Sequence, residues 1–158
     1  MILILSAFDQ SAFSVWFKGS DSIWAYPTVL TLHTFGMMVL VGAVTVVDLR
    51  LLGFGRAIPL GSIRKLFGVT WSAFILNAVT GTILFISDAS KRATQPLFLV
   101  KLLIIAIGVV TMVIIKRNVF DGAEEPVTVH GRARLLAIAS LLIWSAAITA
   151  GRLLAYVA

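Results

Sequence analysis

The chain has 158 residues, of which 59% are hydrophobic, 13% are charged and none is cysteine. Soluble domains have about 45–50% apolar and about 25% charged residues, so this composition indicates a single transmembrane domain over residues 1–158. The absence of cysteine excludes disulfides, thiolate metal sites and covalently attached c-type haem. The net charge is +6, but the basic residues stand at the ends of apolar segments. We therefore expect the lipid bilayer, and no nucleic acid, as their partner.

The first element expected is a short amphipathic helix over residues 6–18, lying in the membrane interface. Phe8, Ala12, Val15 and Trp16 recur there at helical spacing, with polar residues between them. An amphipathic segment of this kind lies along the membrane surface and does not cross it. The alternative is a loosely ordered tail.

Four longer apolar stretches follow, each long enough to cross the hydrocarbon core, which takes about 20 helical residues. They predict spans at about residues 23–50, 64–87, 95–117 and 133–156. The loops between them are short, so consecutive spans are expected to run antiparallel. The predicted fold is all-α: a transmembrane up-down four-helix bundle with the short interfacial helix at its N-terminus.

Lysine and arginine are unequally divided between the two sides of this bundle. Eight lie on the side of the first and third loops, and four lie on the other side. Because basic residues are enriched in cytoplasmic loops, the first side is predicted to face the cytoplasm and both termini to face outward. The eight are Arg50, Arg56, Arg64, Lys65, Lys116, Arg117, Arg132 and Arg134, and the four are Lys18, Lys91, Arg92 and Arg152.

Polar residues inside the spans gather in the predicted outer half of the bilayer. His33 lies about ten residues into the first span, and Lys101 and Arg152 lie near the outer ends of the third and fourth. Asn77 on the second span and Trp144 on the fourth lie on stripes that face the interior at helical spacing, and they complete the candidate cofactor site. An ionisable residue within a span costs several kcal/mol without a partner, which makes it a functional-site hypothesis by default.

These residues also have structural interpretations. His33 is either a packing histidine, bonded to a threonine, an asparagine or a carbonyl, or a group that carries protons or binds haem iron or another metal. Lys101 and Arg152 lie close enough to span ends to extend their charges to lipid headgroups.

A second group of charges lies at the inner edge. Asp48 is predicted to form a structural ion pair with Arg50 or Arg134, which would fix the first span against the fourth. His130, in the polar loop before the fourth span, is expected to be exposed. The motifs HExxH, GxxxxGK[ST], GxSxG and GxGxxG are absent from the chain, as is a run of intramembrane acids. An ordinary secondary transporter is therefore not expected.

Several short runs resemble a family of small uncharacterised bacterial four-span membrane proteins. The resemblance implies a multi-pass protein of the bacterial inner (cytoplasmic) membrane, with no assigned activity. The runs are Trp24–Pro27, Leu32–Gly36, Val41–Gly42, Asp48–Gly53, Thr80–Gly81, Leu84–Phe85, Pro96–Phe98 with Lys101, and Ala150–Tyr156.

More distantly, the deep His33 and the Lys101 of the third span resemble the pattern of the membrane protoporphyrinogen oxidases and of the copper-resistance D membrane proteins. In the oxidase family a histidine and a lysine at such positions are linked to b-type haem and to activity. The resemblance implies that His33 is an axial ligand of haem b. Lys101 and Arg152 would then neutralise its two propionates. A second deep histidine is lacking, so the second ligand would be absent, another residue type, or His33 of a second subunit.

Three functions remain open on these residues. The first is a haem b protein for electron transfer or for porphyrin or quinone redox chemistry. The second is a transporter-like module that binds a small anionic ligand or a lipid. The third is a non-catalytic structural subunit of a larger membrane complex or homo-oligomer. The sequence does not decide whether the chain is an enzyme, or what its substrate and electron partner are.

Overall fold

The computed structural model describes residues 10–19, 24–121 and 131–157. These residues are helical almost throughout, with no strand among them. In chain order the helices are α2 (Ala12–Gly19), α3 (Tyr26–Leu52), α4 (Leu60–Arg64), α5 (Leu66–Ile86), α6 (Ala89–Ala93), α7 (Pro96–Ile115), the π-helix η1 (Lys116–Asp121) and α8 (Gly131–Val157). Four segments are long and apolar enough to cross a membrane, namely Tyr26–Leu52, Gly61–Ile86, Pro96–Asp121 and Gly131–Leu154. The predicted all-α four-helix bundle is therefore confirmed.

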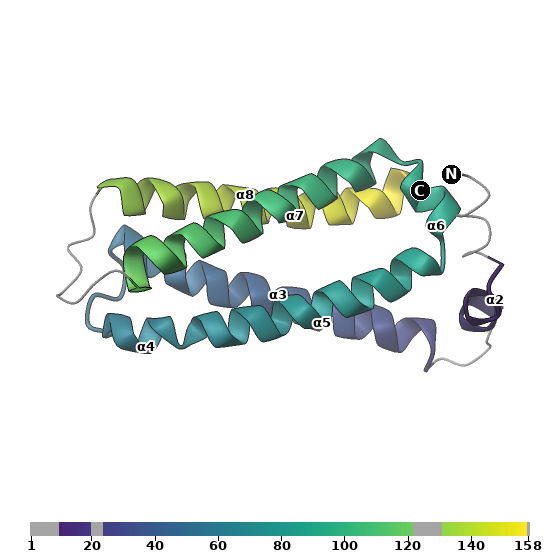
Figure 1. The fold of residues 1–158 in the computed structure, drawn as a ribbon, viewed down its shortest axis with the longest axis horizontal. Helices are drawn as coiled ribbons and strands as arrows, with labels where there is room; N and C mark the ends of the chain where they lie inside the picture. Colours follow the sequence, from purple (N-terminus) through teal and green to yellow (C-terminus); the bar gives the residue numbers. More distant parts are fainter. Residues whose placement is uncertain (1–9, 20–23, 122–130, 158) are drawn as a thin grey trace.

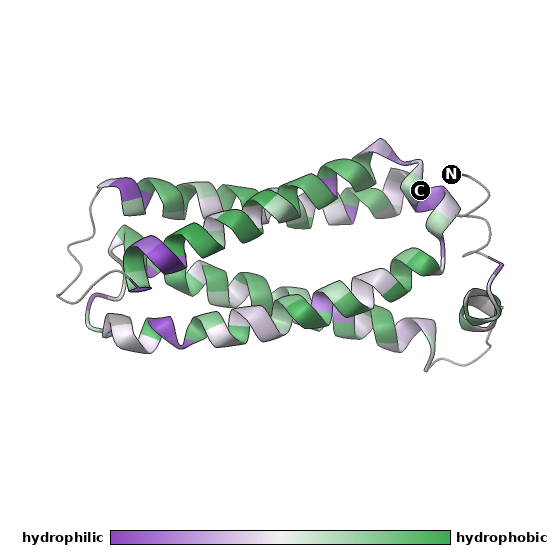
Figure 2. Cartoon of the chain, viewed as in Figure 1, coloured by the Kyte–Doolittle hydropathy of each residue, from purple (hydrophilic) through white to green (hydrophobic). Residues whose placement is uncertain are grey.

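The long helices are apolar around most of their circumference, as Figure 2 shows, and their polar residues concentrate towards the ends. In a bilayer the hydrocarbon satisfies no backbone polar group, so a continuous helix is the structure such a segment adopts. Proline stands in the first turn of α3 and α7, where its missing N–H removes no helical bond. Gly53 ends α3 in the left-handed conformation, with φ of 104°, which glycine adopts without strain.

The four long helices form two antiparallel hairpins (Figure 1). α3 packs against α5, α7 packs against α8, and α3 also packs against α8. Around the bundle the order is therefore α5, α3, α8, α7, and the side between α5 and α7 is the least closely packed. We call the end where α3 begins the outer end, after the predicted orientation, and the opposite end the inner end.

The helix ends differ from the sequence prediction at two places. The second apolar stretch is preceded by the separate short helix α4, and the third continues past Ile115 as η1. η1 lies beside α4, and the ion pair between Arg64 Nη2 and Asp121 Oδ1, at 3.0 Å, joins the two. The short α6 occupies the outer loop between α5 and α7, which the sequence identified only as polar.

A short N-terminal helix is present as α2, overlapping the range predicted for the interfacial helix, and residues 6–9 of that range lie outside the described residues. One face of α2 is docked on the bundle, since Ser14 Oγ donates to the Ser87 carbonyl at 3.2 Å and the Phe17 ring lies 5.7 Å from that of Tyr26. The opposite face exposes Val15 and Trp16. This division fits a helix lying along the surface of a membrane.

Two glycines allow α3 and α5 to approach each other closely. A Cβ atom on Gly36 of α3 would lie 2.8 Å from Asn77 Nδ2, and one on Gly81 of α5 would lie 3.2 Å from His33 Cε1. Close approach at small residues is the usual way in which helices associate in lipid, where the hydrophobic effect between them is weak. The contact between α3 and α5 thus depends on these two positions.

We predict that Gly36→Ala destabilises the protein by about 1–3 kcal/mol, because the added methyl group has no space. Gly42→Ala, on the same helix, is the matched control, since no atom lies within 4 Å of its Cβ position. Thermal unfolding in mild detergent measures both. Equal unfolding midpoints for the two variants would contradict the close approach of α3 and α5.

Candidate functional site

His33 lies at the interface of α3 and α5 in the outer half of the bundle. Its Nδ1 is 2.9 Å from the hydroxyl oxygen of Thr80, and its ring rests against Gly81. Thr80 is buried on α5, one turn before Leu84 on the inward face. The structure thus contains one of the arrangements expected from the sequence, a histidine bonded to a threonine. This bond orients the imidazole.

The bonds of Thr80 determine which nitrogen of His33 carries the proton. Thr80 has one hydroxyl hydrogen, and its oxygen lies 2.7 Å from the Leu76 carbonyl of its own helix. From a hydrogen directed to that carbonyl we infer that the hydroxyl oxygen accepts from the imidazole and that Nδ1 carries the hydrogen. In a neutral ring Nε2 then has a free lone pair. The backbone of Asn77 is a second hydrogen-bonding group beside this ring. Among the described residues no hydrogen bond of Nε2 is found, which leaves that nitrogen to a metal ion or to a hydrogen-bond donor.

Asn77 lies one helical turn deeper than His33, against Gly36. Its Nδ2 donates to the Ala73 carbonyl at 3.1 Å, while its buried Oδ1 has no hydrogen-bond partner in the described parts of the chain. A buried carbonyl oxygen without a donor loses the bond it made to water. Asn77 Oδ1 therefore offers a hydrogen-bond acceptor at the interface of α3 and α5, one turn below His33.

Lys101 enters the outer half from α7. Its Cε and Nζ atoms lie 3.5 Å from the Cβ position of Gly151 on α8, and the side chain is half-buried. The His33 imidazole and the Arg92 guanidinium are its basic neighbours. No ion pair of Lys101 with an acid occurs within residues 10–19, 24–121 and 131–157. Within the part of the chain that the structure describes, basic groups from α3 and α7 thus share one level of the bundle without a counter-charge.

Arg152 and Trp144, the other two predicted cofactor residues, are not brought to His33. The Arg152 guanidinium is exposed, where it donates to the Tyr156 hydroxyl at 3.2 Å and lies 5.4 Å from the centre of that ring. Trp144 is buried between α7 and α8, with its ring 3.2 Å from the Cβ position of Gly108. It packs the centre of the bundle, and its Nε1 has no partner among the described residues.

The predicted ion pair of Asp48 is wrong for this structure. Asp48 is completely buried, and neither carboxyl oxygen has a hydrogen-bond partner in the described residues. Arg50 donates instead to the carbonyls of Ile58 and Arg56, at 3.1 and 3.4 Å. Arg134 is exposed. The physical reason is rotation around the helix, because two residues correspond to about 200°, so Arg50 leaves α3 on the side opposite Asp48.

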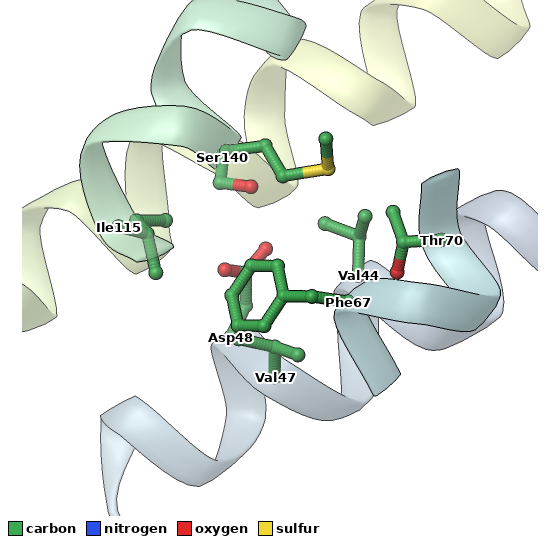
Figure 3. A pocket seen from close by; sticks show the side chains of 8 residues that line it. Val44, Val47, Asp48, Phe67, Thr70, Ile115 and Ser140 are labelled. Atoms are coloured by element: carbon green, nitrogen blue, oxygen red, sulfur yellow. The ribbon is translucent and has the colours of Figure 1, made fainter. Parts of the chain in front are cut away.

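Asp48 points instead into a cavity of about 10 Å³, close to the space that one water molecule needs. Ser140 of α8 faces the same cavity (Figure 3). Its hydroxyl is also buried and without a hydrogen-bond partner in the described residues. Apolar side chains form most of the remaining wall, namely Val44, Val47, Phe67, Met112 and Ile115, with Thr70.

A model of one protein family covers residues 10–157, and its description is Family of unknown function (DUF6644). The chain belongs to this family. No curated protein and no solved structure matches the chain. The family agrees with the expectation of an uncharacterised family, and it assigns no activity.

The described residues of this family member contain no group of three or more metal-ligating His, Cys, Asp or Glu side chains. His130 lies outside the described residues. Two further polar atoms were not identified from the sequence, Arg92 Nε and Gln95 Oε1. Both are buried at the outer end, and neither has a hydrogen-bond partner among the described residues. The sequence gives one indication of Gln95, because it directly precedes Pro96 and so marks the residue before the start of α7.

We predict that Asp48→Asn raises the unfolding midpoint. The substitution keeps the side-chain size and removes a buried acid that lacks a partner. Arg134→Gln should change stability by less than about 0.5 kcal/mol, as expected for an exposed side chain. A double-mutant cycle on thermal unfolding tests both expectations. Loss of stability in each single variant, with strong coupling between them, would show that Asp48 and Arg134 do form an ion pair.

Proposed function

We propose that this membrane protein binds haem b in the outer half of the bundle, with His33 Nε2 as an axial ligand and Lys101 beside a propionate. The observation that supports it best is the Thr80 bond, which leaves the lone pair of Nε2 free. Histidine ligands of metals commonly have their other ring nitrogen bonded in this way, which fixes the tautomer and the ring orientation.

Lys101 supplies the second feature that a haem requires. A half-buried ammonium group in a span without an acid partner is costly, and an anionic ligand offsets that cost. A propionate is such an anion, and Lys101 is already a charged neighbour of His33. The part of the earlier hypothesis that assigned Arg152 to the other propionate is not supported, because its guanidinium is engaged with Tyr156 on the exposed face.

Of this chain, His33 and Lys101 would hold the group, the first through Nε2 and the second through one carboxylate. When bound, haem b would supply one-electron redox chemistry, with quinone or porphyrin as the candidate reaction partners. In the chain itself, Thr80 would orient the imidazole by accepting the hydrogen bond from Nδ1. Lys101 would neutralise the carboxylate of the propionate. The proposal also includes a second haem ligand supplied by another copy of the chain in a homo-oligomer. It places the protein in the inner membrane with both termini facing outward.

The test is the visible spectrum of protein purified in mild detergent after expression with ample haem supply, both oxidised and dithionite-reduced. We expect a Soret band that shifts on reduction in the wild type and is lost in His33→Ala. His130→Ala, the other histidine variant, is the matched control and should keep the band.

A featureless spectrum from folded wild-type protein would overturn the haem proposal, as would a band that survives in His33→Ala. Lys101 would then favour the second candidate, a small anionic ligand or lipid at the same level of the bundle. Native mass spectrometry distinguishes it from a purely structural subunit, because Lys101→Gln would release a retained anion only if one is bound there.

A further inference from the structure

We propose that a basic groove at the inner end binds the headgroup of an anionic phospholipid. The groove has a volume of about 580 Å³ and lies far from His33, at the opposite end of the bundle. Its lining comes from α4, α5 and η1, and comprises Gly61, Arg64, Lys65, Phe67, Gly68, Trp71 and Lys116.

The charges of the groove are arranged for an anion. Lys116 is half-buried and Lys65 is exposed, and neither forms an ion pair in the described residues. Asp121 is already bonded to Arg64 at 3.0 Å. That pair engages the arginine, and among residues 10–19, 24–121 and 131–157 it leaves the two lysines without a counter-ion.

The shape of the groove leaves space for a headgroup. Gly61 and Gly68 have no atom within 4 Å of their Cβ positions, so the wall is open at both places. Trp71 is half-buried, with its ring 5.8 Å from Phe74 in an edge-on arrangement. An indole with an apolar body and a polar N–H is typical of the depth where headgroups meet acyl chains.

The depth of the groove favours a lipid over a soluble phosphate. It lies where two membrane-spanning segments, Gly61–Ile86 and Pro96–Asp121, reach the inner edge. Val69 and Ile114 are exposed apolar residues on the same two segments, which gives acyl chains a surface to follow. Basic sites between transmembrane helices on the cytoplasmic side are suited to anionic lipid headgroups.

Other basic residues of the inner end do not contribute to the groove. Arg50 is bonded to two backbone carbonyls. Arg117 and Arg134 are exposed and do not line the groove. The groove thus differs from a general excess of positive charge at this end, and the two exposed arginines provide a matched control.

The experiment uses the full chain in detergent with equal amounts of phosphatidylglycerol and phosphatidylcholine, and native mass spectrometry measures the retained lipid. We expect preferential retention of phosphatidylglycerol. Each lysine contributes about fivefold to this preference, so Lys65→Gln with Lys116→Gln should reduce it by about tenfold or more. Arg117→Gln with Arg134→Gln removes the same charge and should leave the preference unchanged.

Three results would overturn the proposal. The first is equal retention of both lipids by the wild type. The second is an equal loss of preference in the arginine control, which would indicate a general charge effect. The third is displacement of phosphatidylglycerol by a large excess of inorganic phosphate, which would indicate a site for a soluble anion. Size-exclusion chromatography of both variants confirms that they are folded.

Discussion

The close contact of α3 with α5 at Gly36 and Gly81 is the constraint on which the outer half of the bundle depends. It brings the His33 ring against the backbone of α5 and within 2.9 Å of Thr80. Because Thr80 donates its own hydrogen to Leu76, the imidazole is held with one nitrogen engaged and the other free. A wider separation of the two helices would remove both effects.

The bilayer explains why each polar group inside the bundle needs a specific partner. Hydrocarbon provides no hydrogen bonds, so a polar atom inside the bundle depends on protein, water or a ligand for its partner. Among the described residues, the charged side chain inside the outer half that lacks a counter-charge is basic, Lys101 near His33. In the inner half it is an acid, Asp48, which faces Ser140 across a very small cavity. The outer half therefore suits an anionic ligand, whereas the cavity at Asp48 has room for little more than one water molecule.

The spans and the depth of His33 were predictable from the sequence, because long uncharged stretches have one solution in lipid and helical rise converts residue number into depth. The partner of His33 was narrowed to a threonine, an asparagine or a carbonyl, and Thr80 is one of these. The bond between Arg152 and Tyr156 was also within reach of the sequence, since residues four apart share a helix face.

The remaining features depend on how the helices rotate and pack. The ion pair of Asp48 with Arg50 or Arg134 was inferred from their shared place at the inner edge of the bundle. In the structure the carboxyl group turns inward towards Ser140 and Arg50 turns outward. Lys65 and Lys116 line the same basic groove. They come from different membrane-spanning segments, so helical periodicity within one segment could not predict that they lie close together. The loosely packed side between α5 and α7 likewise appears only when all four helices are placed.

Thr80 is inferred to hold His33 with a proton on Nδ1 and a free lone pair on Nε2. The most direct measurement is the ¹⁵N NMR spectrum of the histidine ring nitrogens in protein purified without added haem, with His130→Gln to assign the signals. We expect the neutral His33 ring to be protonated at Nδ1, and this preference to be lost in Thr80→Val. A proton on Nε2, or a spectrum that Thr80→Val leaves unchanged, would contradict the account.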